Sequence, residues 1–390
     1  MKILYLHIGT AKTATSSIQA FLANNRKVLE QLGYYFPEST HKYPYVNPNR
    51  NAHFMIGDKD EADMRTLPLE DDQDLQDGLA KVRKYFKKYN HIILTDENLW
   101  RASSYLKKDL FPYLKQEAMR QGYQIKLIVY LRRQDQYLTS LWNQNVKRSN
   151  NPYTISLNSY IKRMQKNYNL ILDYASKLDG LAELFGKENL IVRRFEPQSW
   201  KNNSIIDDFM DCIGLKVTPD FQVPDEMKNP RLTNNCVEIK RIINSHPSLS
   251  TEEIDYLASF LKSMSGEHVD GQTADNSYSM LSAKETKTLL AKYAKGNERV
   301  ASEYLKDGKP MFSSEITNLP KWEANNPYML EDVIRFFTLA FAELNQNTKD
   351  MKKEIKHLKK TTVNGQKGGS KYLSKLKHPV SSLFNAKGAN

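Results

Sequence analysis

Four short runs of apolar and β-branched residues recur in this 390-residue sequence, at 3–8, 91–95, 125–131 and 190–195. The segments between them carry the patterns of helices. Near-continuous apolar strands that alternate with helices are typical of a parallel sheet covered on both faces. We therefore expect an α/β fold with a central parallel sheet flanked by helices.

The clearest helical pattern follows the first run. Apolar residues recur at three- and four-residue spacing from Ile18 to Leu32, and Gly33 is a typical helix stop. The spacing predicts a helix over residues 16–32. Residues 153–185 and 230–305 are also mostly helical in pattern.

Residues 1–345 are expected to form a single domain. Within it, residues 40–75 are rich in Pro, Asn and acidic groups without periodicity, which predicts a long loop or lid. Residues 230–305 form a later helical segment. Residues 346–390 are expected to be a basic tail, partly helical and then flexible.

The net charge of +12 belongs mainly to that tail. From residue 349 onwards eleven lysines face only two acidic residues, so the tail contributes +9 and the body about +3. The body therefore gives no reason to expect nucleic acid as a partner. A different class of function remains open, in which the chain is a basic protein without catalysis that docks on nucleic acid or an anionic membrane through its tail. The tail lysines alternate with apolar residues that could lie on a lipid surface.

Membrane spans, disulfide frameworks and structural zinc sites are not expected. No apolar run approaches the roughly 20 residues of a membrane helix, and the first residues lack the pattern of a signal peptide. Cys212 and Cys236 are too few for a disulfide scaffold or a four-cysteine metal site. We expect a cytoplasmic protein, with peripheral contact to the inner membrane face through the tail.

The most informative stretch is residues 7–19, HIGTAKTATSSIQ, where a buried strand turns through small residues into a helix. Such a junction directs free main-chain N–H groups and the positive end of the helix dipole to one point, where an anion binds. Small side chains let the main chain approach the anion closely. Lys12 adds a mobile positive charge, and Thr15 and Ser16 add hydroxyl donors.

The order of residues in this loop differs from that of a nucleotide-binding P-loop, which reads G-x-x-x-x-G-K-[ST]. Here Lys12 follows Gly9 by three positions, and there is no second glycine. The loop instead resembles the 5′-phosphosulfate-binding loop of the sulfotransferase superfamily, roughly [HP]-x-G-x-x-K-T-G-[ST]-[ST], with Ala14 where that family has glycine. The matching residues are His7, Gly9, Lys12, Thr13, Thr15 and Ser16.

This resemblance implies a P-loop NTPase-like sulfotransferase fold of the bacterial, carbohydrate-type branch. It implies a co-substrate, 3′-phosphoadenosine-5′-phosphosulfate (PAPS), and no metal. The residues that it assigns to binding the 5′ end of PAPS are Gly9, Thr10, Ala11, Lys12, Thr13, Ala14, Thr15 and Ser16.

A second motif lies at residues 127–147, where another apolar run ends in charge and leads into a helix. Members of the superfamily carry an arginine at the end of this strand and a serine eight residues later, and both bind the 3′-phosphate. Arg132 and Ser140 have that spacing. A planar guanidinium suits phosphate, and the hydroxyl adds one more hydrogen bond.

The resemblance extends over residues 1–315 and is weaker in its later part. Residues 281–305 are similar to a late helical segment of bacterial sulfotransferases, in which Asn297 and Arg299 would approach the nucleotide. For both residues a place on a charged, solvated helix face is the preferred interpretation.

Sulfuryl transfer needs a cation at the leaving oxygen and a base at the attacking hydroxyl. Lys12 is the expected cation. Two residues compete as the base: Glu97 follows the strand at 91–95, where ligand crevices of parallel sheets form, and His53 lies in the predicted lid. The sequence leaves both open.

The segment IILTDE, residues 92–97, also permits a P-loop kinase or ATPase, with Asp96 on magnesium and Glu97 activating water. The first loop opposes this interpretation because it lacks the Gly-Lys-[Ser/Thr] order that holds the phosphates and the metal.

The acceptor is expected to be a hydroxyl of a saccharide, such as a cell-surface glycan precursor. The predicted lid and two tryptophans offer amides and aromatic faces suited to sugars. These residues are Tyr43, Tyr45, Asn47, Asn49, Asn51, Trp100 and Trp142. The oligomeric state stays open.

Overall fold

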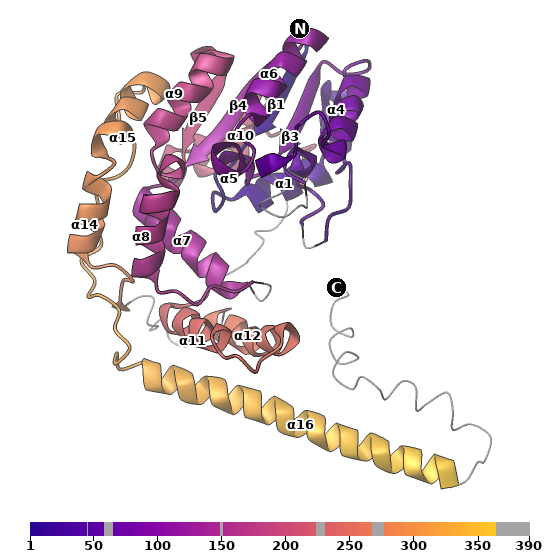
Figure 1. Ribbon diagram of the computed structural model, residues 1–390, viewed down its shortest axis with the longest axis vertical. Coiled ribbons are helices and arrows are strands. Elements are labelled where there is room, and N and C mark those ends of the chain that lie inside the picture. Colours follow the sequence, from indigo (N-terminus) through magenta and orange to yellow (C-terminus); the bar gives the residue numbers. More distant parts are fainter. Residues whose placement is uncertain (45, 58–64, 149–150, 224–230, 267–276, 364–390) are drawn as a thin grey trace.

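A five-stranded sheet forms the centre of the protein. The computed structural model describes residues 1–44, 46–57, 65–148, 151–223, 231–266 and 277–363. All strands run parallel, in the order β2-β3-β1-β4-β5, and helices flank the sheet (Figure 1). The α/β prediction is confirmed. The strands are β1 (Ile3–His7), β2 (Tyr34–Tyr35), β3 (His91–Thr95), β4 (Gln124–Leu131) and β5 (Leu190–Arg194).

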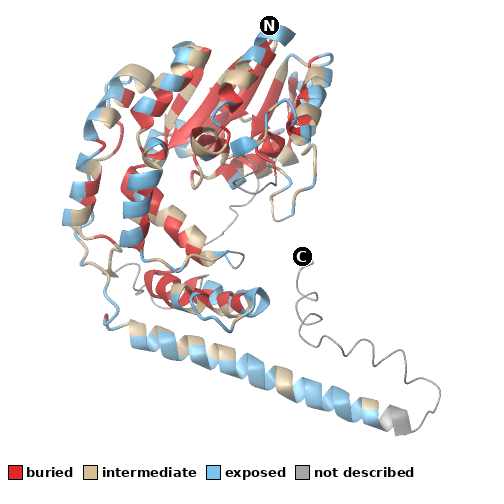
Figure 2. Ribbon diagram, viewed as in Figure 1, coloured by how far each residue is buried: buried red, intermediate tan, exposed pale blue. Residues whose placement is uncertain are grey.

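Both faces of the sheet are buried, as Figure 2 shows in red. In β1, Leu4 and Leu6 belong to one apolar cluster, whereas Ile3 and Tyr5 belong to another on the opposite face. Because side chains alternate between the two faces of a strand, a strand covered on both sides needs apolar residues at every position. This burial explains the continuous apolar runs in the sequence.

Two sets of helices cover these faces. The smaller cluster is built with α1 (Thr15–Asn24), α2 (Arg26–Gln31) and α10 (Ile205–Cys212). The larger cluster includes residues of α4 (Gln73–Tyr85), α5 (Leu99–Tyr105), α6 (Leu110–Gln121), α7 (Gln134–Lys147), α8 (Leu157–Asn167) and α9 (Tyr174–Phe185).

The helix predicted over residues 16–32 is interrupted at Asn25. The Asn25 side-chain amide donates to Phe21 O at 2.8 Å and to Gln222 O at 2.8 Å, so it ends α1 and ties it to a distant loop. Helix α2 then begins at Arg26, and Gly33 follows its end with a positive φ of 82°. The apolar spacing was correct, but it could not reveal this break.

The predicted lid over residues 40–75 is anchored at its centre. A short 3₁₀ turn (His53–Met55) is buried there, together with Asn51 and Ile56. The Asn51 amide donates to Pro37 O and Ile93 O and accepts from Thr95 N, which fixes the segment against β3. Residues 45 and 58–64 lie outside the described residues.

The later helical segment, predicted over residues 230–305, contains α11 (Asn234–Asn244), α12 (Thr251–Gly266), α14 (Ala283–Ala291), α15 (Ala294–Val300) and a π-helical turn (Ala301–Leu305).

A 35-residue helix, α16 (Met329–Val363), runs across the expected domain boundary at 345/346, and the rest of the predicted tail lies outside the described residues. Within the described ranges, no helix has the length and apolar character needed to cross a bilayer. Shorter 3₁₀ turns occur at Asn169–Ile171, Lys187–Asn189, Pro197–Ser199 and Lys201–Asn203.

The strand order places a crevice at the carboxyl ends of β1 and β4. The chain adds β2 and β3 on one side of β1 and then crosses to β4 and β5 on the other side. Ligands of open parallel sheets bind at such a switch point, outside the carboxyl ends of the strands. Both motifs predicted from the sequence, around Lys12 and Arg132, directly follow these two strands.

Candidate functional site

The loop after β1 is held in shape by its own threonines. Thr10 donates from its main-chain N–H and from its hydroxyl to Tyr130 O, at 3.0 Å and 3.1 Å, and the Thr13 hydroxyl donates to Thr10 O at 2.6 Å. Both side chains are buried. Thr10 and Thr13, predicted as nucleotide-binding residues, therefore use their hydroxyls inside the protein, and the main-chain N–H of Thr10 is engaged there as well.

Helix α1 begins directly behind this loop. Its first main-chain hydrogen bonds run from Ser17 and Ile18 N–H to Ala14 O. Among the described residues, no hydrogen bond uses the main-chain N–H groups of Thr15 and Ser16, and both residues line a cavity together with Ala11 and Ala14. Free N–H groups at the first turn of a helix form an anion site. Ala14 takes the left-handed conformation, with φ 56° and ψ 25°, at the position where glycine was expected.

Gly9 is needed where the loop contacts the segment after β3. A Cβ at Gly9 would lie 2.6 Å from the main-chain oxygen of Glu97, and its φ is 111°. The missing side chain therefore makes room for that main chain. The loop that carries Lys12 and the segment that carries Glu97 are in direct contact.

The two predicted motifs meet at Arg132. Its Nη1 donates to Lys12 O at 3.1 Å, and its guanidinium lies 5.4 Å from the centre of the Phe195 ring. Burial and the charge of Arg231 lower the pKa of Arg132, and burial and the charge of Arg132 lower the pKa of Lys12. Two cations held this close in a buried setting favour an anion between them.

Both motifs line one cavity of about 870 Å³. Ser140, on α7, lies on its wall together with Lys12 and Arg132. Among the described lining residues there are eight basic side chains and one carboxylate, that of Glu97. The basic residues are Lys12, Arg50, Arg101, Arg132, Lys147, Arg148, Arg163 and Arg231. Burial and the charges of Lys12 and Lys262 lower the pKa of Lys147 to about 8. Such an excess of positive charge is suited to a multiply charged anion.

Glu97 is the acidic member of this cavity. Its Oε2 accepts from Gln19 Nε2 at 3.0 Å and lies 3.4 Å from Arg50 Nε. The side chain is 18% exposed, enough to meet a ligand while held on two sides. Gln19 and Arg50 were not predicted as site residues, because Gln19 is not one of the motif positions in the stretch 7–19 and both reach Glu97 only through the fold.

Asp96 directly precedes Glu97 in the sequence. It is buried together with His53 and forms hydrogen bonds with His53 and Arg50. Asp96 accepts from Arg50 Nη2 at 2.7 Å, from His53 Nδ1 at 2.8 Å and from Asn98 N at 2.8 Å. Burial raises the pKa of Asp96, but the hydrogen bonds and charges of His53 and Arg50 outweigh it, so that the pKa lies below its ordinary value. His53 is 6% exposed and is not one of the residues that line the cavity. Its ring is placed to orient Asp96 and Arg50.

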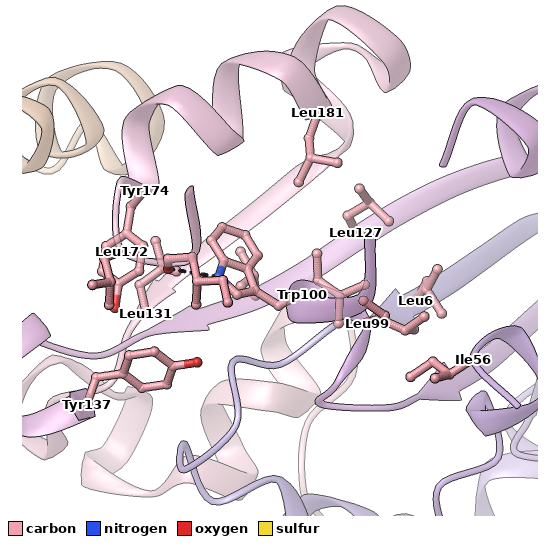
Figure 3. Packing of buried hydrophobic residues seen from close by; sticks show 14 of the residues in the cluster. Leu6, Ile56, Leu99, Trp100, Leu127, Leu131, Tyr137, Leu172, Tyr174 and Leu181 are labelled. Carbon is pink, nitrogen blue, oxygen red and sulfur yellow. Dashed lines mark hydrogen bonds between the residues drawn. The ribbon is translucent and has the colours of Figure 1, made fainter. Parts of the chain in front are cut away.

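The expected aromatic sugar platform is wrong for both tryptophans. Trp100 and Trp142 are fully buried, and their indole N–H groups donate to Ile171 O and Ile155 O. Figure 3 shows Trp100 packed among core side chains. Tyr137, Tyr153, Tyr160 and Tyr168 line the cavity instead.

The other residues expected in that platform have mixed positions. Asn47 lines the cavity, whereas the side chain of Asn51 is buried and forms hydrogen bonds within the fold. The Tyr43 hydroxyl donates to Asp74, and Asn49 N–H donates to the side chain of Asn47. Tyr45 lies outside the described residues.

Residues 281–305 do not line the cavity. Asn297 exchanges hydrogen bonds with Gln134, at 2.9 Å and 3.1 Å, and Arg299 forms an ion pair with Asp179 on the surface. Asn297 instead lines a separate cavity of about 950 Å³ that contains none of the predicted site residues. The preferred interpretation of Arg299, a charged surface position, agrees with its place in the structure.

Comparisons with known proteins give two weak matches. No family model matches the chain. An uncharacterized protein from Archaeoglobus fulgidus is 25% identical over 179 residues, which span 46% of this chain and 45% of that relative. The crystal structure of a sulfotransferase from Alicyclobacillus acidocaldarius is 17% identical and has a TM-score of 0.35, with 68% of this chain and 97% of that chain covered. We therefore base the function on the residues that line the cavity.

Proposed function

We propose that this protein is a sulfotransferase that moves a sulfuryl group from PAPS to a hydroxyl group. The observation that carries the proposal is the contact of Arg132 with Lys12 O, which joins the two motifs in one basic cavity. One motif offers main-chain N–H groups, hydroxyls and a lysine to the phosphosulfate. The other offers Arg132 and Ser140 to the 3′-phosphate that distinguishes this nucleotide.

PAPS supplies an activated sulfuryl group on its 5′-phosphate. In the transfer, the acceptor oxygen forms a bond to sulfur, and the bond between sulfur and the phosphate oxygen breaks, with its electron pair leaving on the bisphosphate. Lys12 would neutralise that leaving oxygen, because its side chain is the mobile cation of the 5′ loop. The N–H groups of Thr15 and Ser16 would hold the phosphate in place.

Glu97 is the base that we propose for the acceptor proton. It is the carboxylate among the described lining residues of the cavity, and Gln19 and Arg50 hold it in position. His53 is assigned a positioning role, since its Nδ1 donates to Asp96 and it does not line the cavity. A base must be able to reach the proton that it removes.

The alternative kinase or ATPase function fits these residues less well. Its magnesium ligand would be Asp96, but both oxygens of that carboxylate accept hydrogen bonds from Arg50, His53 or Asn98, and Asp96 is fully buried. One of these neighbours is the Arg50 cation, whose charge opposes a divalent metal at the same carboxylate.

A saccharide is the proposed acceptor class, because four tyrosines and several amides line the cavity. The expected cytoplasmic location and the contact of the tail with a membrane remain predictions.

Calorimetry with the desulfated donor, adenosine 3′,5′-bisphosphate (PAP), tests the proposed donor. We expect PAP to bind wild-type protein more tightly than ATP, and we expect Lys12→Ala and Arg132→Ala to weaken PAP binding about tenfold or more, since each removes a charge-assisted contact. Arg299→Ala is the matched control, because this arginine lies on the surface outside the cavity. Binding of ATP without binding of PAP would refute the assignment.

A further inference from the structure

We propose that the acceptor itself carries a negative charge, and that Arg101, Arg148 and Arg163 bind it. We call these residues the outer arginine cluster. This inference rests on the proposed function and adds the chemical class of the acceptor: a sugar with a carboxylate, phosphate ester or sulfate ester beside the hydroxyl that is modified.

The outer arginine cluster comes from three separate elements that converge on one wall of the cavity. Arg101 is on α5, Arg148 follows the end of α7, and Arg163 is on α8. All three line the same cavity. Burial raises the pKa of Tyr160, and the charges of Arg101, Arg148 and Arg163 all act on its hydroxyl in the opposite direction. The charges of all three guanidinium groups therefore reach one tyrosine that lines the same cavity.

Two arginines of the outer arginine cluster lack acidic partners among the described residues. Among the described residues, neither Arg148 nor Arg163 forms an ion pair with a carboxylate, and the Glu97 carboxylate is engaged by Gln19 and Arg50. Burial and the charge of Arg101 lower the pKa of Arg148, so the guanidinium groups repel one another in the absence of an anion. Two cations that line one cavity and have no carboxylate partner among the described residues, here Arg148 and Arg163, are suited to binding an anion.

The donor does not account for these arginines. Lys12 and Arg132 are joined to each other, Ser140 lies beside them on the cavity wall, and the charge of Arg231 acts on Arg132. These groups suffice for the two ends of PAPS. The charge of Arg148 still reaches Lys12, and both residues line the same cavity. A charged acceptor bound there would have its hydroxyl near the sulfuryl group.

A binding experiment on the protein saturated with PAP tests this inference. Glucose, glucuronate, glucose 6-phosphate and glucose 6-sulfate would be titrated separately, up to about 10 mM, which still detects the weak binding expected of single sugars. We expect the charged sugars to bind at least tenfold more tightly than glucose. The three charged sugars distinguish a carboxylate from a phosphate or a sulfate ester.

The double variant Arg148→Gln, Arg163→Gln should lose about tenfold or more in affinity for the preferred charged sugar, while its affinity for PAP stays within about twofold. Lys166→Gln is the matched control, since this lysine is exposed on α8 and does not line the cavity. Equal binding of glucose, no binding of any charged sugar, or an unchanged affinity in the double variant would overturn the inference. Failure of PAP to bind would instead count against the proposed donor.

A second inference comes from α16 and does not depend on catalysis. An apolar stripe follows this helix at alternating intervals of four and three residues: Leu330, Ile334, Phe337, Phe341, Leu344, Thr348, Met351, Ile355 and Leu358, with Thr348 as the polar member. Phe337 is 66% exposed and Phe341 is 57% exposed, and their rings stack with centroids 6.0 Å apart. Figure 1 shows α16 extending well beyond α12, and Figure 2 shows it as mostly exposed.

The residues of this stripe are not those by which α16 packs against the rest of the chain. Met329, Phe336 and Leu339 pack against the main apolar cluster. A repeat of 3.5 residues sustained over four heptads is the signature of a coiled coil. With Ile334 and Ile355 at a positions and leucine at most d positions, the pattern favours two strands in parallel.

We infer that α16 pairs with α16 of a second copy of this chain in a parallel coiled coil. In that register, Glu354 at a g position lies opposite Lys359 of the second copy at an e position, so the charges are complementary. A second copy is thus the occupant that both the apolar spacing and the charges fit.

Light scattering of the full chain at about 50 μM tests the pairing, a concentration well above the dissociation constant expected of four heptads. We expect twice the chain mass of 45.2 kDa for wild type and a single chain mass for Ile334→Glu, Phe341→Glu. The control Gln346→Glu, Lys353→Glu changes exposed positions of the same helix outside the stripe and should stay a dimer. Under oxidation, Met351→Cys should crosslink two copies only if they are parallel. A monomeric wild type, or a dimeric Ile334→Glu, Phe341→Glu variant, would overturn the pairing.

Discussion

Lowering the pH should destabilise the folded chain at His7, the last residue of β1. Its ring is fully buried, with Nδ1 2.9 Å from the Thr95 hydroxyl and the Phe209 ring 5.4 Å away. The other ring nitrogen, Nε2, is buried and has no hydrogen-bond partner within the described residues. Burial lowers the pKa of His7 to about 4, although the charge of Asp96 opposes this.

The sign and size of the effect follow from proton linkage. Between the unfolded pKa of 6.5 and the folded pKa of about 4, the unfolded chain binds a proton that the folded chain does not. The free energy of unfolding therefore falls as the pH falls through this window. The full loss is about 3 kcal/mol, because one pKa unit corresponds to about 1.4 kcal/mol, and about 2 kcal/mol of it should appear between about pH 7 and pH 4.5.

Urea unfolding at several pH values measures this slope. His7→Asn is the variant for comparison, because asparagine can still donate to Thr95 and does not titrate. Stabilising carboxylates with lowered pKa values, such as Glu285 and Asp307, lose their contribution only below about pH 4.5, so they do not obscure the window. An equal slope in both proteins would refute the reasoning, as would an NMR titration of the His7 ring with a midpoint near pH 6.5.

Three further predictions concern the predicted loop and its surroundings. Ala14→Gly should change the free energy of unfolding by less than about 1 kcal/mol and leave PAP affinity unchanged, because relief of the left-handed alanine offsets the added chain entropy; a larger loss in a thermal melt contradicts this. Gly9→Ala should lose about 3 kcal/mol of stability and most PAP binding, since its Cβ would meet Glu97 O at 2.6 Å; calorimetry with unchanged affinity would count against it. Asp96→Asn should cost about 3 kcal/mol in urea unfolding and lower turnover, because Arg50 loses its buried partner; wild-type values in both assays would show that this ion pair is dispensable.

Local patterns were enough to predict the sheet. The four apolar runs correspond to β1, β3, β4 and β5 within one residue at either end. These strands are buried on both faces, so most of their positions are apolar, and the signal is strong. The two-residue β2 is too short to leave such a pattern, and the interruption at Asn25 depends on a contact with Gln222, which no local pattern contains.

The site was predictable only where it is local in sequence. Lys12 and Arg132 belong to strand-to-helix junctions, and the structure brings both to one cavity. Arg148 and Arg163 have no such signal, because an arginine on a helix or at its end usually marks a solvated position, and these two line the cavity only through the packing of α7 and α8. Trp100 was expected on the binding surface but lies in the core. Composition alone does not distinguish an aromatic side chain on a binding surface from one in the core.

The close approach of Gly9 to Glu97 O has a consequence for engineering. Because the two main chains touch with no room for a methyl group, neither segment can shift without displacing the other. Replacing residues 7–16 alone with the corresponding loop of another protein should therefore misplace the carboxylate at 97. A productive chimera would have to exchange residues 91–98 at the same time, so these two stretches are expected to behave as one transplantable unit.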